Sequence, residues 1–85
     1  MDRLVFNRKI NGKYVECDAI ATYHDEDSNK DFIVYTDKIL NESGQLKLYY
    51  SYYTMGDKTI KLLPVKDLKG KKVALELIKE VISGL

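Results

Sequence analysis

The spacing of apolar residues changes at Pro64, the only proline in the chain. Before it, apolar residues alternate with polar ones in short runs separated by turn residues, a period of two that is typical of strands. After it, apolar residues recur every three or four positions, as on one stripe of an amphipathic helix. They are Ala74, Leu77, Ile78, Val81, Ile82 and Leu85. The sequence therefore predicts an α+β fold, in which a sheet is followed by one helix that covers one of its faces.

We expect five strands in a simple meander, because each apolar run is joined to the next by a short turn. Their predicted ranges are 3–10, 13–23, 32–38, 45–54 and 59–63, and the helix is predicted at 68–83. A chain of 85 residues suits a single domain, 1–85, and buries about 60% of the surface that it exposes when unfolded. The expected fold is a five-stranded antiparallel β-meander with one C-terminal α-helix packed on one face.

The clearest local signal is Asn11-Gly12, because both residues accept the positive φ angles of a two-residue type I′ turn. Such a turn fixes the register of the first hairpin and places Phe6 opposite Cys17. One face of the hairpin is then apolar and the other mostly polar. Cys17, Ala19 and Ala21 are small, so we expect a helix to lie close against them.

The register of the last two strands depends on the length of the loop at Met55-Gly56-Asp57. A change of one residue in this loop sends every following side chain to the other face. A loop of three residues pairs Tyr52 with Ile60 and Tyr50 with Leu62. This register keeps the inner face apolar, and it is preferred for that reason.

Tyrosine is unusually frequent, with seven residues in the chain. In the fourth strand, alternation sends Tyr50 and Tyr52 to the core face and Tyr49 and Tyr53 to the outer face. The simplest interpretation of the outer pair is stabilisation of a half-exposed sheet. Alternatively the pair, with Tyr14 nearby, forms an aromatic platform that contacts a protein or stacks nucleic-acid bases.

Four lysines gather where the helix begins, close to the expected N-cap Asp67. They are Lys66, Lys69, Lys71 and Lys72. Cations at this end oppose the helix dipole by about a few tenths of a kcal/mol each, and lysines often serve solubility alone. Gly70 leaves the backbone open, so an anion site on free N–H groups is an alternative, although no phosphate-loop motif accompanies it.

No cluster of residues requires a particular chemistry. His24 is the only histidine, and the hairpin register places no serine or cysteine beside it, as a nucleophile and its base require. The loop 24–31 carries acidic and amide side chains at the spacing of the first calcium ligands, but Lys30 and Thr36 stand where an EF-hand needs glycine and glutamate. We expect no catalytic residue, no metal and no cofactor, and therefore not an enzyme.

The compartment and the class of partner follow from composition. A formal net charge of +1 gives no strong attraction to nucleic acid or anionic lipid. No apolar run is long enough to cross a bilayer, and no signal-peptide core follows Met1. The single cysteine, Cys17, suits a reducing cytosol. We expect a cytoplasmic protein without a membrane partner that is a monomer or weak homodimer.

From about Phe6 to Leu85 the chain resembles small bacterial proteins grouped as the domain-of-unknown-function family 1292. The resemblance rests on Val15-Glu16-Cys17-Asp18, Phe32-Ile33-Val34-Tyr35-Thr36-Asp37, Gly44, Tyr49 and Leu63-Pro64-Val65, followed by a short helix. The family has no assigned activity or catalytic residues, and many members are encoded near a gene for a Holliday-junction resolvase-like protein. Its members are usually strongly acidic, whereas this chain is nearly neutral with a lysine-rich C-terminal third.

Together these features predict a small non-enzymatic cytosolic module that binds an unidentified protein partner as an accessory or regulatory factor. The alternative is weak, salt-sensitive nucleic-acid binding through the outer sheet face and the lysines at the helix start. The candidate partner-binding residues are Tyr49, Tyr53, Lys69, Lys71 and Lys72.

Overall fold

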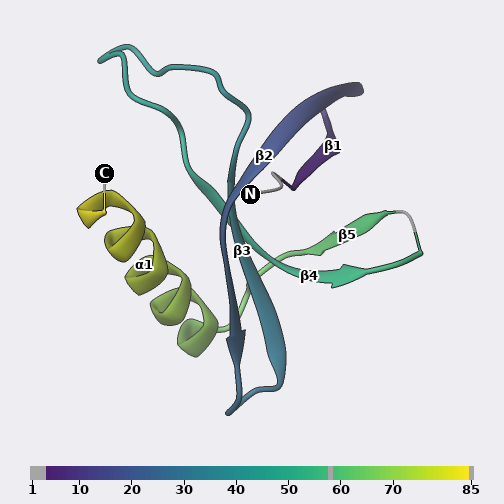
Figure 1. The fold of residues 1–85 in the computed structure, drawn as a ribbon, viewed down its shortest axis with the longest axis vertical. Coiled ribbons are helices and arrows are strands. Elements are labelled where there is room, and N and C mark those ends of the chain that lie inside the picture. Colours follow the sequence, from purple (N-terminus) through teal and green to yellow (C-terminus); the bar gives the residue numbers. More distant parts are fainter. Residues whose placement is uncertain (1–3, 58, 85) are drawn as a thin grey trace.

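Five antiparallel strands form one meander sheet, and one helix follows it, in a computed structural model that describes residues 4–57 and 59–84 (Figure 1). The strands are β1 Val5–Ile10, β2 Lys13–Asp25, β3 Lys30–Thr36, β4 Tyr49–Met55 and β5 Ile60–Leu63, and the helix is α1 Leu68–Ser83. The predicted fold class is confirmed, and α1 coincides with the predicted helix. Arg3 in the first predicted strand and Leu85 in the helical stripe lie outside the described residues.

The hairpin of β1 and β2 has the predicted turn and register. Asn11 and Gly12 have φ angles of 50° and 80°. Positive φ angles at both central residues are what a type I′ turn requires. Phe6 lies opposite Cys17. The backbone N–H of Ala19 donates to the carbonyl of Leu4 over 2.8 Å, so contact between the strands extends past the end of β1.

A bulge at Ile20 interrupts the ladder between β2 and β3. Ala19 pairs with Tyr35, but Ala21 pairs with Val34, so the register shifts between them. Because a bulge adds one residue to one strand, Ala19 and Ala21 face opposite sides of the sheet. The expectation that Cys17, Ala19 and Ala21 share the helix-covered face is therefore wrong for Cys17 and Ala19.

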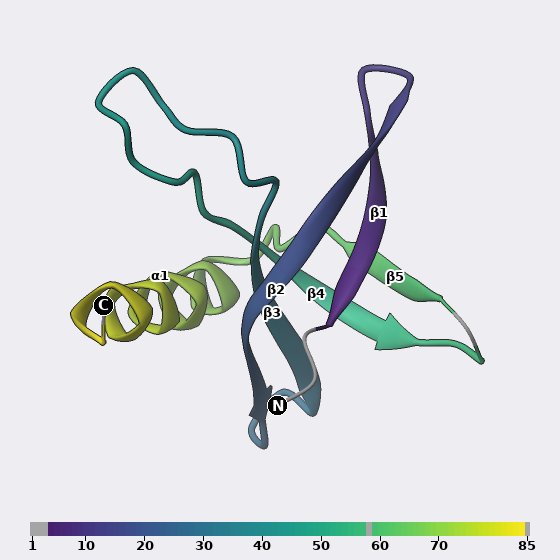
Figure 2. The same ribbon diagram turned by 45° about the horizontal axis from the view of Figure 1, so that its top comes forward.

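The sheet has a core on each of its two faces. The helix-side core consists of Phe32, Tyr52, Val65 and Ala74, with Tyr50, Val73 and Leu77 packed against it. The concave-side core consists of Cys17, Ile33 and Tyr35, with Leu4, Phe6, Ala19, Tyr49, Tyr53 and Leu62 packed against it. The concave-side core is covered by the sheet itself. The sheet curls, so that β1 and β5 both lie on the side away from α1 (Figure 2).

The register between β4 and β5 differs from the preferred one. Tyr52 pairs with Leu63, Tyr53 with Leu62, and Met55 with Ile60. The loop is closed by the Gly56 N–H, which donates to the Thr59 carbonyl over 2.8 Å. The predicted pairing of Tyr52 with Ile60 is wrong because it assumed a single apolar face, whereas Leu62 and Tyr53 share the concave-side core.

Residues 37–48 leave the sheet as an irregular arm that ends in a turn at 41–44 (Figures 1 and 2). The predicted strands 32–38 and 45–54 extend too far into this arm. Lys38 has a φ of 67°, a left-handed conformation that ends β3, and a single bridge joins Leu40 to Leu46. Gly44, with a φ of 78°, completes the turn.

Candidate functional site

A pocket lies where β3 and β4 part. Their ladder ends at Phe32 opposite Tyr52, although β3 begins two residues earlier and β4 continues to Met55. The hairpins β2–β3 and β4–β5 then point in different directions (Figure 2). The opening between them, here called the wedge pocket, has a volume of about 530 Å³, within the range of ordinary ligand pockets.

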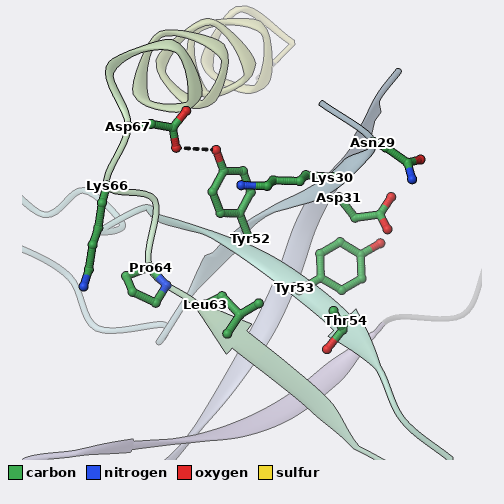
Figure 3. Close-up of a pocket in the computed structure, with 10 residues that line it drawn as sticks. All are labelled: Asn29, Lys30, Asp31, Tyr52, Tyr53, Thr54, Leu63, Pro64, Lys66 and Asp67. Atoms are coloured by element: carbon green, nitrogen blue, oxygen red, sulfur yellow. Dashed lines mark hydrogen bonds between the residues drawn. The ribbon is translucent and has the colours of Figure 1, made fainter. Parts of the chain in front are cut away.

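The walls of the wedge pocket are mostly aromatic and apolar. Tyr52 and Tyr53 come from β4, and Leu63 and Pro64 come from the end of β5 and the segment after it (Figure 3). The polar residues of the lining are Asn29, Lys30, Asp31, Thr54, Lys66 and Asp67. Rigid rings beside aliphatic groups, with a few polar groups at the edge, are typical of sites that receive a side chain or a small ligand.

Asp67 fixes one wall of this pocket by holding the helix to the sheet. The Tyr52 hydroxyl donates to Asp67 Oδ1 over 2.7 Å, and the Gly70 N–H donates to Asp67 Oδ2 over 2.8 Å. Asp67 is thus the N-cap of α1, as predicted. A β-carbon at Gly70 would overlap the Tyr52 hydroxyl, so only glycine allows this approach. We call Tyr52, Asp67 and Gly70 the latch.

The latch changes the acidity of its two titratable groups in opposite directions. Burial, together with the hydrogen bond to the Asp67 carboxylate, raises the pKa of Tyr52 to about 12. The hydrogen bonds from Tyr52 and from the Gly70 N–H lower the pKa of Asp67. Both shifts follow from one arrangement, a neutral phenol that donates to an ionised carboxylate.

Two lysines belong to the lining of the wedge pocket. The Lys30 Nζ lies 4.6 Å from the centre of the Tyr52 ring, within the range of a cation–π contact. Lys66 extends on the other side of Tyr52 in the view of Figure 3. In that view the Lys66 ammonium group points away from Tyr52. The carboxylates of Asp31 and Asp67 belong to the same lining, so the rim carries charges of both signs.

The two candidate tyrosines do not form the expected exposed platform. Tyr53 is half-buried and lines the wedge pocket. Tyr49 is also half-buried; its hydroxyl donates to Asp37 Oδ2 over 3.0 Å, and its ring stacks on Tyr35 with centroids 5.5 Å apart. Tyr14 is 74% exposed at the far hairpin tip. The platform prediction is wrong because the sheet curls and its outer face becomes a core.

The lysines Lys69, Lys71 and Lys72 are exposed on the first turns of α1. An anion site on the free backbone of Gly70 is ruled out by the latch. The Gly70 N–H already donates to Asp67, and the Lys71 N–H donates to the Asp67 carbonyl over 3.0 Å. A carboxylate occupies the position that an anion would take. Contact of these lysines with a partner stays a prediction.

Arg8 is a residue whose role the sequence did not suggest. Its guanidinium lies 5.5 Å from the centre of the Tyr35 ring and 5.8 Å from that of Tyr49, and it donates to the Tyr35 hydroxyl. The hairpin register placed Arg8 on the same face as Phe6 and Cys17. That register is the available signal, because it points an arginine towards the apolar face of the hairpin.

The remaining candidate groups are engaged within the fold. Burial and the nearby Asp37 raise the pKa of the Cys17 thiol, which disfavours the reactive thiolate. In the acidic loop, Ser28 Oγ donates to Asp25 over 2.7 Å, and His24 Nδ1 lies 2.8 Å from Asp31 Oδ1. Within residues 4–57 and 59–84, no group of three or more His, Cys, Asp or Glu side chains is arranged to hold a metal ion.

No family model, no curated protein and no solved structure matches this chain. The resemblance to the family of unknown function therefore stays a prediction. In the described part of the chain, no helix is both long enough and apolar enough to cross a membrane.

Proposed function

We propose that this protein is a small non-enzymatic module that binds a protein partner through the wedge pocket, as an accessory or regulatory factor. The observation that carries the proposal is the composition of this pocket, in which Tyr52, Tyr53 and Pro64 lie with Lys30 and Lys66 in one lining, and the Lys30 ammonium group lies over the Tyr52 ring. Tyrosines in desolvated pockets are common anchors of protein interfaces. Lys66 is exposed at this pocket and would pair with a carboxylate of the partner segment.

The shape of the pocket favours an extended segment of the partner. The pocket opens between two strands whose ladder has ended, so it is a narrow wedge rather than a broad face. An extended chain presents alternate side chains to one surface. One apolar or aromatic side chain would enter between Tyr53 and Pro64, and a neighbouring Asp or Glu would reach Lys66.

The non-enzymatic character and the cytoplasmic location are part of the same proposal. Support comes from the raised pKa of the Cys17 thiol, which disfavours the reactive thiolate. A lone buried cysteine suits a reducing compartment. Membership of the bacterial family of unknown function is proposed on the residues quoted for the resemblance, and no cofactor is proposed.

The test is affinity capture with the immobilised protein from nuclease-treated lysate, followed by titration of the recovered partner. Lys66→Glu reverses an exposed rim charge and Tyr53→Ala removes a wall of the pocket. Lys13→Glu and Tyr14→Ala are matched controls at the distant tip of the first hairpin. We expect Tyr53→Ala to cost about 2 kcal/mol of binding free energy and both controls to bind normally. A partner that binds the Lys66→Glu and Tyr53→Ala proteins as well as the wild type contradicts the proposal.

Nucleic-acid binding is a second candidate, because Lys66 is exposed at the wedge pocket and Lys69, Lys71 and Lys72 are exposed on the first turns of α1. Lysines that neutralise phosphates make affinity fall steeply as salt rises. Changing Lys69, Lys71 and Lys72 together to alanine would then flatten the salt dependence by about one unit per lost contact. Salt-steep oligonucleotide binding that survives Tyr53→Ala but not the triple change would favour this function over the first.

A further inference from the structure

The two edges of the sheet face one another across a gap. The strand order is β1-β2-β3-β4-β5, so β1 and β5 are the edges. The sheet curls into an incomplete barrel, and both edges lie on the side away from α1 (Figure 2). Two cavities of about 500 Å³ each lie between them, and each is lined by residues of both β1 and β5. We call these two cavities together the barrel gap.

The two edges run in the same direction. One cavity brings residues 4–7, at the start of β1, near Ile60 at the start of β5. The other brings Arg8, further along β1, near residues 62–63 at the end of β5. The meander explains this arrangement, because five alternating strands leave the first and the last pointing the same way. One further strand, antiparallel to both edges, would restore the alternation and close the barrel.

The backbone of β1 is arranged to pair with such a strand. In an antiparallel pair, alternate residues direct both N–H and C=O groups to the neighbouring strand, and the residues between them direct theirs away. The Ala19 N–H donates to the Leu4 carbonyl over 2.8 Å, so Leu4 is directed towards β2. The residues of β1 that are directed away from β2 are therefore Val5, Asn7 and Lys9.

The backbone of β5 shows the same arrangement. The Thr59 carbonyl accepts from the Gly56 N–H over 2.8 Å, so Thr59 is directed towards β4. By alternation, Ile60 and Leu62 direct their N–H and C=O groups away from β4. A row of outward donors and acceptors at alternate residues is the surface to which an extended peptide adds as a strand.

The side chains of the barrel gap favour an acidic residue at one place. Of the described residues that line the cavity at the end of β5, Arg8 alone carries a charge. Within the described chain, no carboxylate lies at ion-pair distance from Arg8. A guanidinium has five N–H donors, and the Tyr35 hydroxyl is the acceptor that Arg8 has. Arg8 therefore keeps donors that suit a carboxylate.

The remaining charges lie outside that cavity. Lys9 and Lys61 are exposed on the two edge strands. The acidic residues of β2 beside β1 are Glu16 and Asp18, which alternate with Cys17 and so belong to the face opposite the concave-side core. Their carboxylates lie 3.4 Å and 3.6 Å from Lys38 Nζ. The other cavity contains Asp57 among mainly apolar residues, so it favours an apolar side chain.

We propose that the barrel gap binds an extended segment of a partner protein, which adds as a strand antiparallel to β1 and β5. An Asp or Glu side chain of this segment pairs with Arg8, and an apolar side chain enters the cavity beside Phe6 and Met55. A second copy of the chain fits less well, because neither edge strand contains an acidic residue to meet Arg8. The site does not depend on the proposed function, although Leu63 and Pro64 line both the gap and the wedge pocket.

Selection from random linear peptides displayed on phage tests the chemistry of the occupant, with the whole chain as bait. We expect the selected peptides to carry Asp or Glu among β-branched residues. Arg8→Gln removes the central charge, and Lys9→Glu combined with Lys61→Glu changes only exposed side chains, so the second variant carries the test if the first does not fold. Each should raise the dissociation constant of a selected peptide about tenfold or more. Lys47→Glu combined with Lys79→Glu is the matched control, because both lysines are exposed on other elements, and it should bind like the wild type.

Amide hydrogen exchange, followed by NMR, locates the added strand. Phe6 and Arg8 are internal controls, because alternation directs their N–H groups towards β2. The N–H groups that should exchange about tenfold more slowly when the peptide is bound are those of Val5, Asn7, Lys9, Ile60 and Leu62.

Three results would overturn the proposal. The first is selection of peptides without acidic residues, or of none. The second is a peptide whose affinity falls in Lys66→Glu but not in the Arg8 and Lys9 variants, which would instead support the proposed function at the wedge pocket. The third is unchanged exchange of the edge amides on binding. Protection of these amides in the chain alone, as its concentration rises, would assign the gap to a second copy and also contradict the proposal.

Discussion

The two sides of the sheet are built from the same strands but are closed in different ways. Phe32 and Tyr52 face α1, whereas their neighbours Ile33 and Tyr53 face the concave side. The helix-side core is covered by a separate element that the latch holds in place. The concave-side core is covered only by the curl of the sheet. Two cavities of about 500 Å³ each remain between β1 and the β4–β5 hairpin.

The comparison teaches that closure by a helix is encoded locally and closure by curling is not. The cap, the helix and its apolar stripe lie within 18 consecutive residues, from Asp67 to Gly84. The curl depends on a bulge at Ile20 in β2, the register of β5 and the contact of Arg8 with Tyr35 and Tyr49. These features are far apart in the sequence, so each is set by the whole sheet.

The largest expected effects come from truncating one buried residue on each side. Phe32 and Ile33 are adjacent in β3 and essentially fully buried. We expect Phe32→Ala to lower the free energy of unfolding by about 3–5 kcal/mol and Ile33→Ala by about 2–5 kcal/mol. Urea denaturation measures both. If Ile33→Ala cost less than about 1 kcal/mol, the concave side would not be a true core and the comparison would fail.

The latch is tested by Gly70→Ala, alone and combined with Tyr52→Phe. Alanine is preferred over glycine inside a helix by about 1 kcal/mol, yet its β-carbon would overlap the Tyr52 hydroxyl. We expect Gly70→Ala to destabilise the protein by about 1–3 kcal/mol, as over-packing does. In the Tyr52→Phe background that hydroxyl is absent, so the cost should shrink or change sign. Equal costs in the two backgrounds, measured by urea denaturation, would mean that the hydroxyl is not the obstacle.

The helix itself is tested by comparing Leu77 with Ile82. Leu77 is half-buried against the helix-side core, whereas Ile82 is 56% exposed near the end of α1. We expect Leu77→Ala to cost about 1–2 kcal/mol, because part of the side chain is already solvated. Ile82→Ala should cost less than about 0.5 kcal/mol at concentrations where the protein is a monomer. Losses below that value at both Leu77 and Ile78 would mean that the helix is detached.

The sequence predicts the locally encoded elements of the fold but not those that depend on the curl of the sheet. The first hairpin is readable because Asn11-Gly12 sets its register, and α1 is readable from Asp67 and the period of its apolar residues. The burial of Tyr49 is not predicted, because the alternation of side chains assigns them to two faces but does not show that both faces are covered. Tyr53 was a candidate residue, but the wedge pocket around it arises from the parting of β3 and β4, which no local pattern encodes.

The smallest effect expected is the pH dependence of the latch. The pKa of Asp67 is lowered in the folded state, so its ionised form stabilises the fold above the ordinary aspartate pKa, and this stabilisation is lost as pH falls through the lowered value. Tyr52 behaves oppositely, because its pKa is raised to about 12. Its contribution is complete below the ordinary tyrosine pKa of about 10 and is lost between about pH 10 and pH 12.

Urea midpoints measured across pH separate these contributions from those of the concave side. Asp67→Asn should reduce the loss of stability at low pH, and Tyr52→Phe should reduce part of the loss at high pH. Burial also raises the pKa of Tyr35 and Tyr49, so an alkaline loss that belongs to the concave side should persist in Tyr52→Phe. Asp25→Asn is the acid control, because the hydrogen bond that lowers the pKa of Asp25 comes from Ser28, which is not part of the latch. If the loss of stability at low pH were unchanged in Asp67→Asn and absent in Asp25→Asn, the latch would not be the cause of this pH dependence.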